Sequence, residues 1–130
     1  MQAKEILSTI KSKMALLNIY KVEIKTLDLM IGKINGIDSL ASTGARMTEF
    51  RDNLLKDAES VISVAEMALN LVNSLEDTRQ KDLIVSHYFQ GKPISQIALE
   101  MGLSRWKADQ LHTAALEQLD LMLMNEGATS

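Results

Sequence analysis

The sequence predicts an all-α protein, and three observations support this prediction. Aromatic residues make up only 4% of the chain, whereas β-sheets are usually rich in them. There is one proline in 130 residues, so few positions interrupt a helix. Apolar residues recur at helical spacings over two long stretches. We therefore expect an N-terminal antiparallel hairpin of long helices in residues 1–75, followed by a C-terminal helix-turn-helix domain in residues 76–130.

The first helix is expected over residues 3–34, which contain no proline. Its apolar positions form two rows, each with a period of seven residues, so they share one broad face of a helix. Lys13 is the polar break in these rows, and its aliphatic stem can lie along an apolar face while its charge stays in water. The rows are Ala3, Ile10, Leu17, Ile24 and Ile31, and Ile6, Lys13, Tyr20, Leu27 and Ile34.

Residues 35–46, NGIDSLASTGAR, have the composition of a connecting loop. Thr48 is then the expected cap of a second long helix. Its first apolar row is Leu54, Ala58, Val61, Ala65, Ala68, Val72 and Leu75, and its second row is Leu55, Ile62 and Leu69.

A hairpin alone cannot bury both of these rows. The C-terminal domain or a second copy of the chain must therefore cover the second row. The C-terminal tail adds a further apolar side with Leu119, Met122 and Leu123. From these features we predict a homodimer.

A third helix is expected over residues 75–91, LEDTRQKDLIVSHYFQG, with Ser74 or Asp77 as its cap. We expect His87, near the end of this helix, to lie at the junction between the hairpin and the C-terminal domain. The chain then continues directly into the segment with the most specific pattern.

Residues 91–111, GKPISQIALEMGLSRWKADQL, have the pattern of a helix-turn-helix. Ala98 is the small residue where the two helices cross, and Gly102 can adopt the positive φ of the turn. Pro93 fits the first turn of the first helix, and Ser104 can cap the second. The inward positions are Ile94, Ile97, Met101, Leu103, Ala108 and Leu111.

The charge distribution does not predict a broad nucleic-acid surface. The net charge is −3, and all of it comes from residues 76–130, which hold 5 Lys/Arg and 8 Asp/Glu. DNA-binding modules usually present a basic surface, because phosphate contacts supply much of their affinity. Any DNA contact must therefore depend on a local basic set, which is Lys92, Arg105, Lys107 and His112, with Arg79 and Lys81.

Residues 75–119, from LEDTRQ to LEQL, resemble region four of primary sigma factors, the domain that reads promoters. The shared features are the Gly-Leu-Ser-Arg turn and the helix end at 114–119, AALEQL. With Leu111 and His112 before it, the segment is still more similar to phage transcriptional regulators of the RinA/ArpU type, in which a sigma-like module follows a helical hairpin. The resemblance implies a phage regulator of transcription that binds double-stranded DNA in the major groove, with RNA polymerase or another host protein as a further candidate partner.

The resemblance also assigns DNA contacts to five residues, which are Arg105, Trp106, Lys107, Asp109 and Gln110. Arg105 could bond a guanine edge and Gln110 an adenine edge, while Lys107 would hold a phosphate. We expect His112 on the outer part of the recognition helix, where it could reach a phosphate; the alternative is a structural or solvated histidine, which is the more common role of a lone histidine. The complete predicted DNA-binding set is Lys92, Ser104, Arg105, Trp106, Lys107, Asp109, Gln110 and His112.

Two of these positions depart from the sigma pattern. Trp106 stands where glutamate is usual, and it could contact a sugar or a thymine methyl, dock on a partner protein, or fold back on its own domain. Asp109 stands where arginine is common. Its carboxylate repels phosphate and could accept only from a base amino group, such as that of cytosine.

The acidic C-terminal half and Trp106 keep an alternative open. In that alternative the chain is a phage protein-interaction module, or an inhibitor of a host enzyme or defence nuclease, without sequence-specific DNA binding. The sequence has no cysteine, no phosphate-binding glycine loop and no metalloprotease or serine-hydrolase motif, so we expect no enzyme, no cofactor and no metal. The lack of cysteine and of a long apolar run predicts a cytoplasmic protein of the host cell with no membrane contact.

Overall fold

The computed structural model describes the backbone of residues 2–129 and the side chains of residues 2–125. Within this part of the chain there are helices and no strand, which confirms the all-α prediction. The elements in order are α1 (Gln2–Ile34), the 3-10 turn η1 (Asp38–Leu40), α2 (Ala41–Asn73), α3 (Thr78–Ile84), the π-helical turn η2 (Val85–Phe89), α4 (Ile94–Met101) and α5 (Arg105–Thr129).

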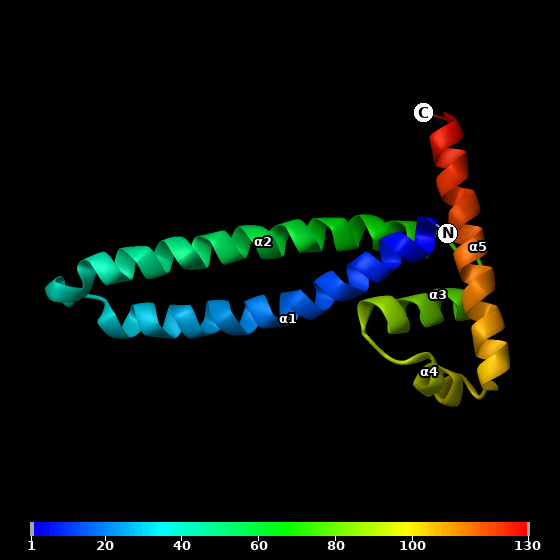
Figure 1. The fold of residues 1–130 in the computed structure, drawn as a ribbon, viewed down its shortest axis with the longest axis horizontal. Helices are drawn as coiled ribbons and strands as arrows, with labels where there is room; N and C mark the ends of the chain where they lie inside the picture. Colours follow the sequence, from blue (N-terminus) through cyan, green and yellow to red (C-terminus); the bar gives the residue numbers. More distant parts are fainter. Residues whose placement is uncertain (1, 130) are drawn as a thin grey trace.

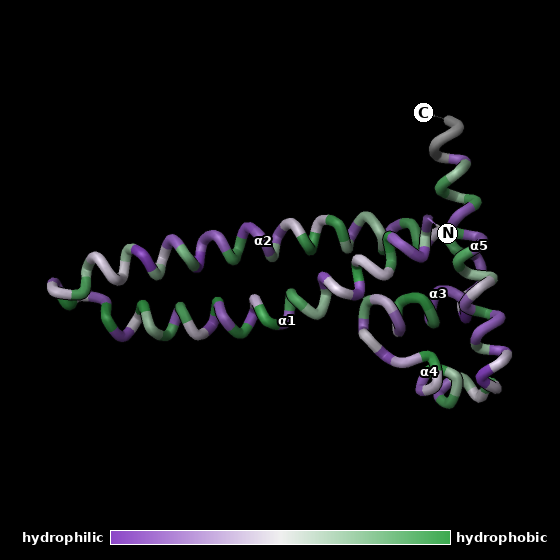
Figure 2. The backbone as a smooth tube through the Cα atoms, in the orientation of Figure 1, coloured by the Kyte–Doolittle hydropathy of each residue, from purple (hydrophilic) through white to green (hydrophobic). Residues whose placement is uncertain are grey.

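The helices α1 and α2 run side by side in opposite directions (Figure 1). Hydrophobic and hydrophilic positions alternate along both helices out to the closed end, which projects far beyond the other elements (Figure 2). The small residues Ala58 and Ala68 are buried on α2, and their lack of bulk lets the two helices approach closely. The other buried residues of this pair are Ala3, Leu7, Ile10, Leu54, Val61 and Val72.

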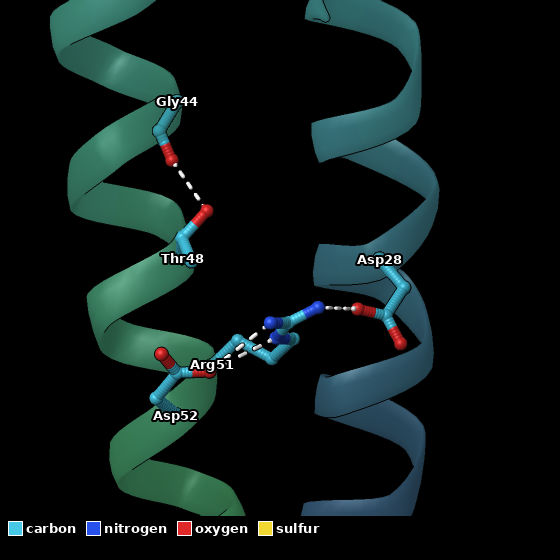
Figure 3. Close-up of polar contacts among 5 residues, drawn as sticks. All are labelled: Asp28, Gly44, Thr48, Arg51 and Asp52. Atoms are coloured by element: carbon cyan, nitrogen blue, oxygen red, sulfur yellow. Dashed lines mark hydrogen bonds and ion pairs between the residues drawn. The ribbon is translucent and has the colours of Figure 1, made fainter.

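The connection between α1 and α2 is shorter than predicted. The chain turns at Gly36, which has a φ of 86°, and α2 begins at Ala41, so the predicted loop over residues 35–46 and the predicted cap at Thr48 are wrong. The Thr48 hydroxyl instead donates within the helix to the carbonyl of Gly44 over 2.9 Å (Figure 3). A side chain added at Gly44 would contact Ile34 at 3.6 Å, so this first part of α2 packs against the end of α1. Tertiary packing thus overrides a composition that is typical of a loop.

An ion pair links the two helices near their closed end. The guanidinium of Arg51 lies 2.9 Å from a carboxylate oxygen of Asp28 on α1 and 3.1 Å from one of Asp52 on its own helix (Figure 3). Exposed pairs of this kind contribute roughly 0–1 kcal/mol, so the apolar rows stabilise the hairpin more than this contact does.

One cluster of buried residues joins the base of the hairpin to the C-terminal elements. Ala3 and Leu7 of α1 and Val72 at the end of α2 belong to the same cluster as the inward residues of the later helices. From α3, η2, α4 and α5 the buried members are Leu83, Ile84, Tyr88, Ile94, Ile97, Ala98, Ala108, Ala115, Leu116 and Leu119. The position of α5 across the open end of the hairpin is therefore fixed by a shared core (Figure 1).

Two features bear on the surface available to a second copy. Leu119 is fully buried, and the partly buried Met122 and Leu123 pack against the same core, so this side of the tail contributes to the core of a single chain. In contrast, Leu55 and Ile62 on α2 are 39% and 43% exposed. The C-terminal elements therefore do not cover the second row of α2 at these two positions.

Candidate functional site

The candidate site begins at the turn between α4 and α5. Gly102 ends α4 in the left-handed conformation, with a φ of 69°, as predicted from its place in the sequence. The N–H of the next residue, Leu103, donates to the carbonyl of Ala98 over 2.8 Å, which closes the turn. Ala98 is 4% exposed and Ala108 is fully buried, so small side chains lie on both sides of the turn. Pro93 precedes α4 and is its N-cap.

Ser104 caps α5, as predicted. Its hydroxyl oxygen accepts a hydrogen bond from the N–H of Lys107 over 3.1 Å. This capping satisfies one of the helix N–H groups that have no partner inside the helix. This cap fixes where α5 begins. The exposed side chains of α5 therefore start at Arg105, directly after the turn between α4 and α5.

Trp106 lies on the surface of this first turn and is 65% exposed. The sequence left three alternatives for its ring, which were contact with DNA, contact with a partner protein and packing on its own domain. The exposure of the ring excludes the third alternative in the described chain. Together with Asp109, Gln110 and Glu117 it lines a shallow hollow along α5, to which Thr113 and Ala114 also contribute. The predicted contact residues Trp106, Asp109 and Gln110 are thus brought together on one exposed side of the helix.

Arg105 and Asp109 form an ion pair one turn apart on α5. The Nε of Arg105 donates to Oδ1 of Asp109 over 3.1 Å, and both side chains are more than half exposed. The negative charge of Asp109, which would repel phosphate, is therefore partly neutralised by Arg105 on the same helix. In the described part of the chain, the two terminal nitrogens of Arg105 have no further partner.

Lys92 is also engaged by a carboxylate. Its ammonium lies 3.1 Å from Glu100 of α4, and Gln96 donates to the same carboxylate. The hydrogen bond from Lys92, followed by that from Gln96, lowers the pKa of Glu100. A lysine held in this way is a weaker candidate for a phosphate contact than the sequence alone indicates.

Three members of the local basic set, Lys81, Lys107 and Arg79, form no ion pair among the described residues, and Lys107 and Arg79 lie close together. These two residues line one hollow together with Leu103, Gln110 and Leu111. Arg79 lies in the first turn of α3, where Asp77 accepts from its backbone N–H over 2.9 Å and caps the helix. Arg79 is outside the predicted contact set, although its place in the local basic set was visible from the sequence.

His112 does not face outward, so its predicted phosphate contact is corrected. Its Nε2 lies 2.7 Å from the hydroxyl of the buried Tyr88, and its ring is half-buried between elements. Burial, then the neighbouring His87 and Lys4, lower the pKa of His112, while Asp109 opposes this shift. Burial also raises the pKa of Tyr88.

The other histidine lies beside this pair. The ring of His87 contacts Tyr88 edge-on at 4.7 Å between centroids and His112 at 5.6 Å. Its Nδ1 lies 2.7 Å from the carbonyl oxygen of Lys92. Because the turn η2 that carries His87 packs against α1, the residue lies at the junction between hairpin and C-terminal elements, as expected.

Among the described residues, no group of three or more possible metal ligands comes together. No helix in residues 2–129 is both long enough and apolar enough to cross a membrane. Comparison of the chain with protein-family models, with curated proteins and with solved structures finds no match. The function must therefore be inferred from the geometry of the site itself.

Proposed function

We propose that this chain is a phage-type, DNA-binding regulator of transcription that places the first turns of α5 in the major groove. One observation carries the proposal. Arg105 and Gln110, which have the hydrogen-bonding groups that read guanine and adenine, lie exposed at the start of the helix that follows the Gly102 turn. The beginning of this second helix is the part that contacts base edges in helix-turn-helix proteins.

Contacts to the DNA backbone would come from Arg79 and Lys107, which line the same hollow. Both side chains can donate to phosphate oxygens, and phosphate contacts fix the register of a protein on the duplex. Because so few cations are available, affinity of a single copy should be modest and should decline only gently with salt. Dimerisation through the hairpin would raise the affinity by joining two binding units.

The test is a gel shift with the DNA upstream of the gene that encodes this chain, at about 100 mM salt. Arg105→Ala should weaken binding about tenfold, because a good contact to a base edge is worth roughly 1–3 kcal/mol. Arg46→Ala is the matched control, since Arg46 is an exposed arginine on α2, far from α5 in the sequence. Equal binding by wild type and Arg105→Ala would show that α5 does not bind in the major groove as proposed.

A second candidate function is favoured by the exposed apolar side chains near the turn. Leu99 of α4 is 82% exposed and Trp106 is 65% exposed, and the hollow beside Trp106 also contains the acidic Asp109 and Glu117. Such a surface would suit a protein-interaction module that blocks a host enzyme or a defence nuclease. Recovery of a nuclease or polymerase subunit from DNA-free host lysate by wild type, but not by Trp106→Ala, would favour this candidate.

A further inference from the structure

The ion pair on α5 has a geometry that bears on base recognition. Asp109 engages Arg105 through Nε, the nitrogen nearest the aliphatic stem, over 3.1 Å. Neither terminal nitrogen is hydrogen-bonded to the carboxylate, so both remain available as donors. An arginine held at Nε can therefore present a pair of donors in one plane.

We infer that Asp109 is a positioning residue that holds Arg105 for bidentate recognition of a guanine in the major groove. This inference rests on the proposed function. Guanine offers two adjacent acceptors, O6 and N7, which match two parallel donors. Adenine offers one acceptor beside a donor, which arginine cannot pair because it has no acceptor. Guanine is therefore the base that this arrangement selects.

Stability alone gives little reason for an aspartate at this position. Both members of the pair are well exposed, with 61% and 53% of their side chains accessible, and exposed pairs contribute little to folding. A carboxylate beside DNA also repels the phosphates. What Asp109 does contribute is restriction of a long, flexible side chain before binding, which reduces the ordering cost of the complex.

Glu117 provides a matched control on the same helix. It has the same charge as Asp109 and lines the same hollow, but it lies twelve positions after Arg105 and has no ion pair with it. Removal of either carboxylate should reduce repulsion of DNA in general. Only removal of Asp109 should release Arg105.

The experiment is selection of binding sites from a randomised duplex library by wild type, Arg105→Ala, Asp109→Ala, Asp109→Asn and Glu117→Ala. Wild type should enrich a guanine that Arg105→Ala no longer selects. Asp109→Ala should bind random DNA at least as tightly as wild type, yet its preference for that guanine should fall about fivefold. Asp109→Asn should keep part of the preference, because its carbonyl oxygen can still accept from Nε. Glu117→Ala should gain affinity without losing the preference.

Two results would overturn the inference, and they differ from each other. If wild type and Asp109→Ala select the guanine equally while Arg105→Ala loses it, the proposed function stands and Asp109 does not position Arg105. If wild type enriches no sequence, the proposed function fails, and the role of Asp109 fails with it. Circular dichroism of each variant checks that the helices are intact.

Discussion

The backbone N–H of Ala3 donates a hydrogen bond of 2.7 Å to Oδ1 of Asp120. The donor lies in the first turn of α1, where helix N–H groups have no partner inside the helix, and the acceptor comes from α5. A carboxylate at this end also interacts favourably with the helix dipole. This contact therefore fixes the base of the hairpin against the helix that carries the candidate site.

Asp120→Ala should lower the free energy of unfolding by about 1–2 kcal/mol, because Ala3 is 1% exposed and its N–H would lose its acceptor. Asp120→Asn should lose less, since an amide oxygen still accepts. Urea unfolding measures both changes. Glu117→Ala, at an exposed position on the same helix, is the control, and an equal loss in Glu117→Ala and Asp120→Ala would contradict the role of this contact.

Gly102→Ala should destabilise the chain by about 1–2 kcal/mol, because a residue with a side chain is strained at a φ of 69°. The space around Gly102 is open, so the cost comes from the backbone and not from a clash. Gly32→Ala is the opposite control. Gly32 lies inside α1 with open space around it, so an alanine there should stabilise by about 0.5–1 kcal/mol. Thermal unfolding that gives the two variants shifts of the same sign would contradict this account.

Local rules predicted the turn well but not the first part of α2. A glycine four residues after a small inward residue, followed by a serine cap, is a pattern with strict backbone requirements, and Gly102 and Ser104 meet them. The start of α2 has no such requirement. There, serine, threonine and glycine indicated a loop, but packing of Gly44 against Ile34 favours a helix.

The inward orientation of His112 can be predicted from the sequence. His112 lies four residues after Ala108 and seven before Leu119, both of which are fully buried, so helical spacing places it on the inward side. The π-helical turn that brings Tyr88 to His112 has no sequence signal that we can identify. The ion pair between Arg105 and Asp109 follows a spacing of four that indicates possible contact, but side-chain direction decides whether it forms.

The buried position of His112 predicts a pH dependence of stability. Its pKa is lowered in the folded chain, so the folded state binds a proton less readily than the unfolded state, whose pKa is about 6.5. The contribution of His112 to stability is therefore fully present above that pH. It decreases as the pH falls through the pKa of the unfolded state towards the lower pKa of the folded state. His87, Lys4 and Asp109 are the charged or titratable groups that act on it, and the Tyr88 hydroxyl is its hydrogen-bond partner.

Urea unfolding at pH 7.5 and pH 5.5 measures this dependence. Wild type should lose more stability between the two values than His112→Gln, whose amide can still pair with Tyr88 but cannot become charged. Carboxylates titrate alike in both proteins, so the difference reports on His112. Identical losses in the two proteins would show that His112 is not the group responsible.

The exposed second row of α2 predicts self-association. Leu55 and Ile62 lie about two helical turns apart on the same side of α2, are 39% and 43% exposed, and are left uncovered by the C-terminal elements. Burial of such residues against a second copy is favourable, at roughly 25 cal/mol for each Å² of apolar surface. Light scattering at high micromolar concentration should therefore give the mass of a dimer for the wild type.

Ile62→Lys should shift this equilibrium to the monomer, because a charge placed in the row would have to be desolvated without a partner. Ser63→Lys is the matched control, since it adds the same charge to the adjacent exposed position on a different side of α2. It should remain a dimer. A monomeric wild type, or a dimer that Ile62→Lys leaves intact, would mean that this row does not bind a second copy.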